Sequence, residues 1–102
     1  MELLINKKDD VTTVSLAGRL DTPAAQDISS NKMGPLMEAA SGTIIMDCKE
    51  LTYISSSGLR IVLAIRKEAA QKGGKVIVKS ISDDIRHVFM MTGFLNLFQV
   101  ED

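Results

Sequence analysis

The feature that most constrains the fold of this chain is an apolar run near its middle, Thr43–Cys48. Ile44, Ile45 and Met46 follow one another without the alternation of apolar and polar residues that a half-solvated strand shows. The run therefore predicts a central strand covered on both faces. Such strands are typical of parallel sheets, in which crossover helices cover the sheet.

Strand signals stand on both sides of this run. Leu3–Ile5 and Val11–Ala17 predict two strands, and the turn-forming residues Lys8–Asp10 between them predict a hairpin. Lys75–Ser80 predicts a further strand, and Leu97–Val100 predicts a short one at the edge of the sheet.

Helix signals separate these strands. Thr22 can cap a first helix and Pro23 suits its first turn, whereas Gly34–Pro35 should break or kink it. A long helix is predicted over about Ser57–Lys72, and Ser82 can cap a third. The order β-β-α-β-α-β-α-β predicts an α/β domain with a mixed sheet of four to five strands and helices packed against it.

Length, charge and composition exclude several classes of protein. The 102 residues suit one domain, and 45% apolar residues favour a packed core. A net charge of −1 gives no overall bias toward nucleic acid, so no direct nucleic-acid partner is predicted. No stretch approaches the roughly 20 apolar residues that span a bilayer, and the N-terminus shows no signal-peptide pattern. We expect a cytoplasmic protein.

The single cysteine, Cys48, cannot form an internal disulfide, and its apolar context predicts a buried thiol. With one histidine in the chain, a zinc site of the usual Cys/His type is not expected. We predict no metal and no cofactor.

Three consecutive serines, Ser55, Ser56 and Ser57, follow a predicted loop, Lys49–Ser55, at the start of the long helix. A serine there can cap the free N–H groups of the first turn, and physics alone favours that simple role. The same N–H groups and the helix dipole also stabilise negative charge, so a phosphate added here would be tolerated by the fold. One capping serine explains one position only, which leaves a phosphorylation site as the second interpretation.

The long helix has an apolar arc, which predicts its core face: Leu59, Val62, Leu63, Ala69 and Ala70. Arg60 lies on the opposite, polar stripe. Ile61 lies outside the apolar arc, one turn after the serines. It is either a contact for a partner protein or one of the isolated exposed apolar residues that most proteins carry.

Three segments together resemble the STAS domain family, and bacterial anti-sigma factor antagonists in particular. Tyr53–Arg60, preceded by Ile44–Asp47, is similar to the family signature. Gly18–Asp21 resembles a Gly-x-Leu-Asp pattern before the first helix, and Met91–Phe98 resembles a C-terminal Thr-Gly segment. The resemblance implies one STAS domain over residues 1–102.

The resemblance also implies a mechanism. A dephosphorylated antagonist binds an anti-sigma factor that is also a serine kinase, and this frees a sigma factor. The kinase phosphorylates the antagonist with ATP and so releases it, and a metal-dependent serine phosphatase resets the cycle. In the family pattern Asp-Ser-Ser-Gly the serine after Asp is the acceptor, which here is Ser56. Ser55 stands where well-studied members carry Asp. The residues implied in switching or partner binding are Asp21, Ser55, Ser57, Gly58, Arg60 and Ile61.

Two rival interpretations remain. A serine hydrolase would need a base for Ser56, but the only histidine is His87 on the third helix, and no Gly-x-Ser-x-Gly or nucleotide-binding loop is present. We therefore predict no catalytic residue and no enzyme. The resemblance also allows a stand-alone STAS subunit of a membrane lipid transporter or of a stress-sensing assembly. The oligomeric state is left open.

Overall fold

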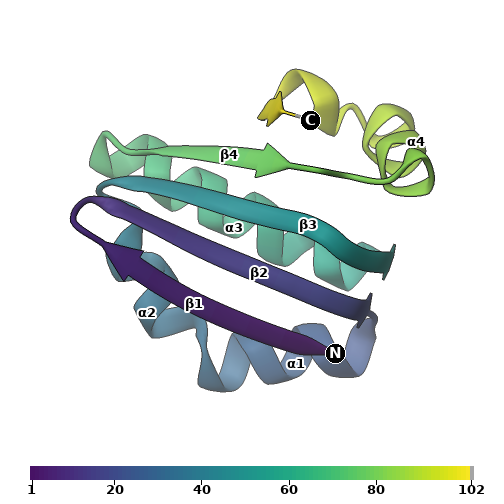
Figure 1. Cartoon of the computed structure of the whole chain (residues 1–102), viewed down its shortest axis with the longest axis horizontal. Coiled ribbons are helices and arrows are strands. Elements are labelled where there is room, and N and C mark those ends of the chain that lie inside the picture. Colours follow the sequence, from purple (N-terminus) through teal and green to yellow (C-terminus); the bar gives the residue numbers. More distant parts are fainter. Residues whose placement is uncertain (102) are drawn as a thin grey trace.

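The computed structural model describes residues 1–101, and these form one mixed α/β domain (Figure 1). The strands are β1 (Glu2–Lys8), β2 (Val11–Leu20), β3 (Thr43–Ile54), β4 (Lys75–Lys79) and β5 (Gln99–Glu101). The helices are α1 (Thr22–Asn31), α2 (Met33–Ala39), α3 (Ser56–Lys72), α4 (Asp83–Thr92) and the 3₁₀ helix η1 (Phe94–Asn96). The predicted fold class is confirmed, with two helices rather than one between β2 and β3.

The sheet contains five strands in the described residues, and their spatial order is the chain order, β1 to β5. β1 pairs antiparallel with β2, and the later neighbours pair in parallel. Each crossover from β2 onward thus moves one strand further in the same direction. Because such crossovers are right-handed, their helices lie on one side of the sheet. Figure 1 shows α1, α2 and α3 behind the sheet, and α4 beyond the end of β4.

This one-sided arrangement corrects the expectation that the central strand is covered on both faces. In β3, Ile44 and Met46 are buried in the core, whereas Ile45 and Asp47 are half-buried on the face without helices. The register aligns Ile44 with Val76 of β4, which is also in the core. The continuous apolar run therefore indicated a central position, but not which layers cover it.

Two element boundaries differ from the sequence-based expectation. The first helix breaks at Lys32, not at Gly34–Pro35, and Pro35 lies in the first turn of α2, where its missing N–H has no intrahelical partner. The predicted loop over Lys49–Ser55 is wrong, because β3 continues to Ile54 with two register shifts against β2. These bulges interrupt the alternation by which a strand is recognised in a sequence.

Cys48 is buried, as predicted. Its removal from water, and secondarily the nearby Asp47 carboxylate, raise the pKa of the thiol to about 12. None of the helices within residues 1–101 combines the length and the apolar character that crossing a bilayer requires.

Candidate functional site

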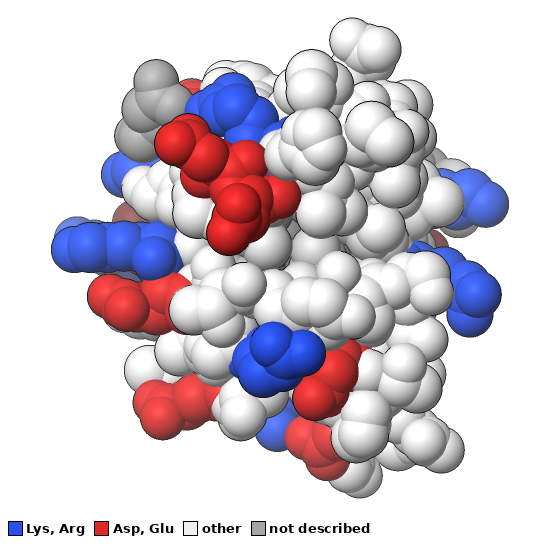
Figure 2. All heavy atoms as spheres, turned by 90° about the vertical axis from the view of Figure 1, so that its right-hand side faces the viewer, with Lys and Arg blue, Asp and Glu red and all other residues white. Residues whose placement is uncertain are grey.

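The carboxyl ends of β2, β3 and β4 lead into the N-termini of α1, α3 and α4 at one end of the sheet, which faces the viewer in Figure 2. We call this end, which carries Ser55, Ser56 and Ser57, the serine edge. A side chain caps each helix. The Asp21 Oδ1 accepts from the Ala24 N–H at 3.1 Å, the Ser55 Oγ from Gly58 at 3.1 Å, and the Ser82 Oγ from Ile85 at 3.2 Å. Figure 2 shows an acidic cluster above the middle of this face and a basic side chain beside an acidic one below it, with an uncharged band between them.

The cap of α1 corrects the expectation that Thr22 has this role. Asp21 is the cap, with an extended backbone, and Thr22 is the first helical residue. A carboxylate suits this position better than a hydroxyl, because it also complements the positive end of the helix dipole.

The three serines at the start of α3 occupy different environments. Ser55 is half-buried, its Oγ caps the helix, and its N–H donates to the Leu20 carbonyl at 2.9 Å. Ser56 is the first residue of α3 and is exposed to solvent. Ser57 is half-buried and lies along the flank of α3 that faces α1. The serine that the resemblance implies as acceptor is therefore the exposed one.

Gly58 permits the close approach of α3 to the end of β2. A Cβ at this position would lie 2.7 Å from the Leu20 Cγ and 3.0 Å from both the Ile54 Cγ1 and the Leu20 carbonyl oxygen. Leu20 and Ile54 are buried, so neither side chain can move aside without disturbing the core. A residue without a side chain is needed to hold the serines beside Leu20 and hence beside the Asp21 loop.

An exposed aromatic–cation pair lies next to this edge, and the sequence analysis missed it. The Arg19 guanidinium lies 4.1 Å from the ring centroid of Tyr53, and Tyr53 is 40% exposed. The two residues are neighbours only because the register shift places Arg19 of β2 opposite Tyr53 of β3. No pattern in the sequence reveals that register.

A shallow groove of about 330 Å³ lies between α1 and α3. It is lined by Thr22, Ala25, Gln26, Ser29, Ser57, Arg60 and Ile61. Arg60 is exposed, but Ile61 is half-buried and packs against the core. The expectation that Ile61 lies outside the core face is thus only partly right, because the neighbouring α1 covers the flank of α3 on which Ile61 lies.

The buried face of α3 is rotated relative to the predicted core face, because α1 packs beside this helix. The buried residues are Gly58, Leu59, Val62, Ile65 and Ala69. Leu63 is only half-buried and Ala70 is exposed. An apolar arc read from one helix cannot show that a second helix packs beside it.

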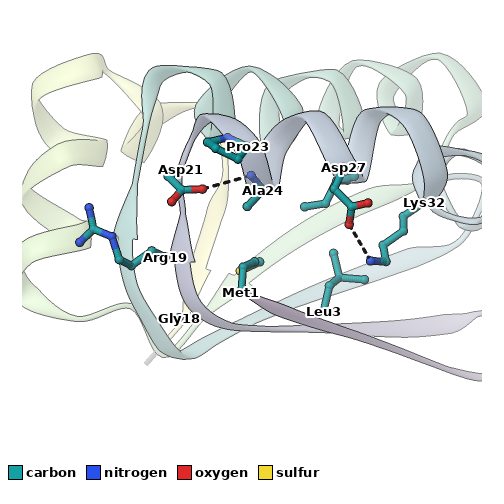
Figure 3. Close-up of a pocket in the computed structure, with 10 residues that line it drawn as sticks. Met1, Leu3, Gly18, Arg19, Asp21, Pro23, Ala24, Asp27 and Lys32 are labelled. Carbon is teal, nitrogen blue, oxygen red and sulfur yellow. Dashed lines mark hydrogen bonds and ion pairs between the residues drawn. The ribbon is translucent and has the colours of Figure 1, made fainter.

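A larger pocket of about 550 Å³ lies on the other flank of α1, between that helix and the start of β1 (Figure 3). Met1 and Leu3 line it from β1 and its N-terminal end, and Asp27 and Lys32 from α1 and its C-terminal end. The Lys32 Nζ lies 3.0 Å from an Asp27 carboxylate oxygen, and hydrogen bonds from Lys32 and Asn31 lower the pKa of Asp27. Of the predicted site residues only Asp21 reaches this pocket, so it is not the site of the serines.

Residues 2–102 match the profile of the STAS domain family. This chain belongs to the STAS domain family. The match covers nearly the whole chain, and the family assignment made from the serine motif and its flanking segments is confirmed.

Relatives of this STAS domain carry the names of anti-sigma factor antagonists. BtrV of Bordetella bronchiseptica, which is provisionally so named, is 29% identical over 100 residues, which cover 98% of this chain and 85% of BtrV. The anti-sigma F factor antagonist of Lysinibacillus sphaericus is 27% identical over 82% of this chain and 72% of its own length.

Solved structures of the same fold include both states of a phosphorylated protein. Unphosphorylated SpoIIAA superposes with a TM-score of 0.77 over 99% of this chain and 88% of its own, at 24% identity. The phosphorylated form of this Bacillus protein gives 0.75 over 97% and 90%, also at 24% identity. At this identity the likeness establishes the fold.

The side chains at the serine edge are hydroxyl, carboxylate and guanidinium groups. His87 is exposed on α4, a helix distinct from the one that carries the serines. Within residues 1–101, no group of three or more His, Cys, Asp or Glu side chains is placed to hold a metal ion. The STAS domain thus presents exposed hydroxyl and guanidinium groups at this edge, and a partner protein can contact them.

Proposed function

We propose that this STAS domain is a cytoplasmic anti-sigma factor antagonist with its switch at Ser56. In the dephosphorylated form it binds an anti-sigma factor that is a serine kinase, and so frees a sigma factor. The kinase transfers the γ-phosphoryl group of ATP to the Ser56 Oγ, with loss of the hydroxyl proton and release of ADP, and the complex separates. A metal-dependent serine phosphatase hydrolyses the ester to serine and inorganic phosphate. The names of the relatives support this assignment.

The observation that carries the proposal is the different environment of each serine. A kinase must seat the acceptor hydroxyl in its own active site, so the acceptor must project from the surface. Ser56 is exposed at the first position of α3. The Ser55 Oγ is already engaged by the Gly58 N–H, and Ser57 is half-buried in the groove. This favours Ser56 as acceptor and gives Ser55 the role of holding the helix start.

A phosphate on Ser56 would change the partner interface more than the fold. It adds about 1.5 to 2 negative charges and three acceptor oxygens. The N-terminus of α3 stabilises this charge within the chain, but a partner surface that fits a neutral hydroxyl must desolvate it without a match. Burying an unpaired charge at an interface costs about 2–5 kcal/mol, which weakens binding by roughly 30-fold to several thousand-fold. The nearby Asp21 carboxylate would make the local field still more negative.

The partner surface that we propose comprises the exposed edge at Ser56 and the groove beside it. Ser57, Arg60 and Ile61 line that groove together with residues of α1. Gly58 contributes by holding α3 against Leu20, and Asp21 by starting α1 at the correct place.

Mass spectrometry after incubation with the cognate kinase and ATP tests the proposal. We expect one phosphate on Ser56 in the wild type and in the Ser57→Ala variant, and none in Ser56→Ala. The Ser56→Ala protein should still bind the kinase but should not be released by ATP. Ser56→Asp should bind poorly, though better than phosphoserine, because it carries one charge only.

Phosphate on Ser55 or Ser57 alone would contradict the site assignment. Absence of phosphate with any cognate kinase would favour the transporter-subunit interpretation. A pull-down from native lysate with wild-type and Ser56→Asp protein would identify the partner as the protein lost from the second sample.

A further inference from the structure

Arg60 has an uncommitted guanidinium within reach of the switch serine. It is exposed on α3, and within residues 1–101 it makes no hydrogen bond, ion pair or ring contact. Other arginines are engaged: the Arg66 Nε donates to the Leu97 carbonyl at 2.6 Å, and Arg19 stacks on Tyr53. Its guanidinium therefore makes no contact that the fold depends on and is available to bind an anion.

The helix geometry brings Ser56 within reach of the Arg60 side chain. Residues four apart lie on the same face of a helix, with Cβ atoms about 6 Å apart. Long side chains in helices lean back toward the N-terminus. From its place in the groove beside Ser57, the Arg60 side chain can therefore reach the space above Ser56 without any change in the backbone.

We propose that the Arg60 guanidinium binds the phosphate on Ser56 within the same chain. In doing so, the Arg60 side chain leaves the groove between α1 and α3. The inference rests on the proposed function, because it takes Ser56 as the phosphorylated residue. The planar guanidinium offers paired N–H donors that match two phosphate oxygens, which a lysine ammonium cannot do.

The consequence is that one covalent change alters two contact groups. Without phosphate, a partner meets a neutral hydroxyl at Ser56 and a free cation at Arg60 in the groove. With phosphate, the hydroxyl becomes an anion, and the cation turns toward it and away from Ile61. A partner that uses an acidic side chain to bind Arg60 would lose that contact in the same step.

The second pKa of the phosphate reports whether the phosphate on Ser56 pairs with Arg60. Phosphoserine loses its second proton with a pKa of about 6. An adjacent guanidinium stabilises the dianion and lowers that pKa, so the pairing is complete above about pH 6 and is lost as the pH falls through the lowered pKa. The acidic groups Asp21, Asp83 and Asp84 at the same edge act in the opposite direction, and Arg19 acts in the same direction. Only the difference between the wild type and an Arg60 variant isolates the pair.

The test is a phosphorus NMR titration of the full chain, with phosphoserine incorporated at position 56 during translation. We expect the second pKa to be higher in Arg60→Gln than in the wild type by roughly 0.15–0.4 unit. Arg60→Lys should fall between the two. Lys67→Gln is the matched control, because Lys67 is exposed on the same stripe of α3 but roughly 16 Å from Ser56 along the axis, beyond the screening length of about 8 Å.

An unchanged pKa in Arg60→Gln, or an equal shift in Lys67→Gln, would overturn the inference. Melting curves of the unphosphorylated variants verify folding and should coincide with that of the wild type. Because the phosphoserine is installed without a kinase, the titration does not depend on the partner. If the kinase modifies another residue while the Arg60 shift is present, the proposed function fails and the pair stands.

Discussion

Replacement of Gly58 by alanine is the sharpest test of how the fold positions the serines. The added methyl group would meet the Leu20 Cγ at 2.7 Å and the Leu20 carbonyl oxygen at 3.0 Å. Leu20 is 1% exposed, and its carbonyl already accepts the Ser55 N–H at 2.9 Å. Relief of the clash must therefore come from a shift of α3, which stretches that hydrogen bond.

The expected effect follows from two opposing terms. Overpacking of this kind costs about 1–3 kcal/mol, whereas alanine in place of glycine favours a helix by up to about 1 kcal/mol. We expect a net loss of about 1–2 kcal/mol in the free energy of unfolding, which lowers the melting temperature by about 4–8 °C per kcal/mol in a domain of this size. Amide exchange at Ser55 should accelerate, because its acceptor moves.

Gly34→Ala provides the control in the same chain. A Cβ at Gly34 would meet nothing within 4 Å, so the substitution should be neutral or stabilise by about 0.4–1 kcal/mol. Urea denaturation of both variants measures the contrast. In a Leu20→Ala background, the Gly58→Ala change should cost less than in the wild type, because the obstructing side chain is gone. Equal or greater stability of Gly58→Ala than of the wild type would refute the close-approach argument.

Further predictions concern Ser55, Ile61 and Cys48. Ser55→Ala removes the cap of α3 and should cost about 1 kcal/mol of stability by urea denaturation, while phosphorylation of Ser56 persists; loss of phosphorylation would assign Ser55 a direct role. Ile61→Glu should weaken partner binding by roughly 1–3 kcal/mol in calorimetric titration and, because Ile61 is half-buried, should also lower stability by about 1 kcal/mol; unchanged affinity would remove Ile61 from the interface. The raised pKa of Cys48, about 12 against 9.0 for a free thiol, predicts no reaction with Ellman's reagent at pH 8 until the chain unfolds. The same shift adds stability that is complete below pH 9 and is lost as the pH rises through 12, a dependence that Cys48→Ala should reduce.

Local signals in the sequence determined most of the elements and their order. Apolar runs rich in β-branched residues marked β2 and β4, and capping serines marked the starts of α3 and α4. The motif from Tyr53 to Arg60 identified the STAS family, which the family profile bears out. These signals can be recognised in the sequence because helix capping and strand propensity depend on a few adjacent residues.

Only the tertiary structure decided which side of each element is buried and which serine is free. Whether Ile61 faces solvent or α1, and whether Arg19 meets Tyr53, depends on helix packing and on a shifted register between strands distant in the sequence. The same applies to the serines: three identical side chains differ because Ser55 is engaged by Gly58, Ser57 faces α1, and Ser56 points to solvent. The number of covered sheet faces likewise follows from the direction of successive crossovers, a property of the whole chain path that no single run of residues carries.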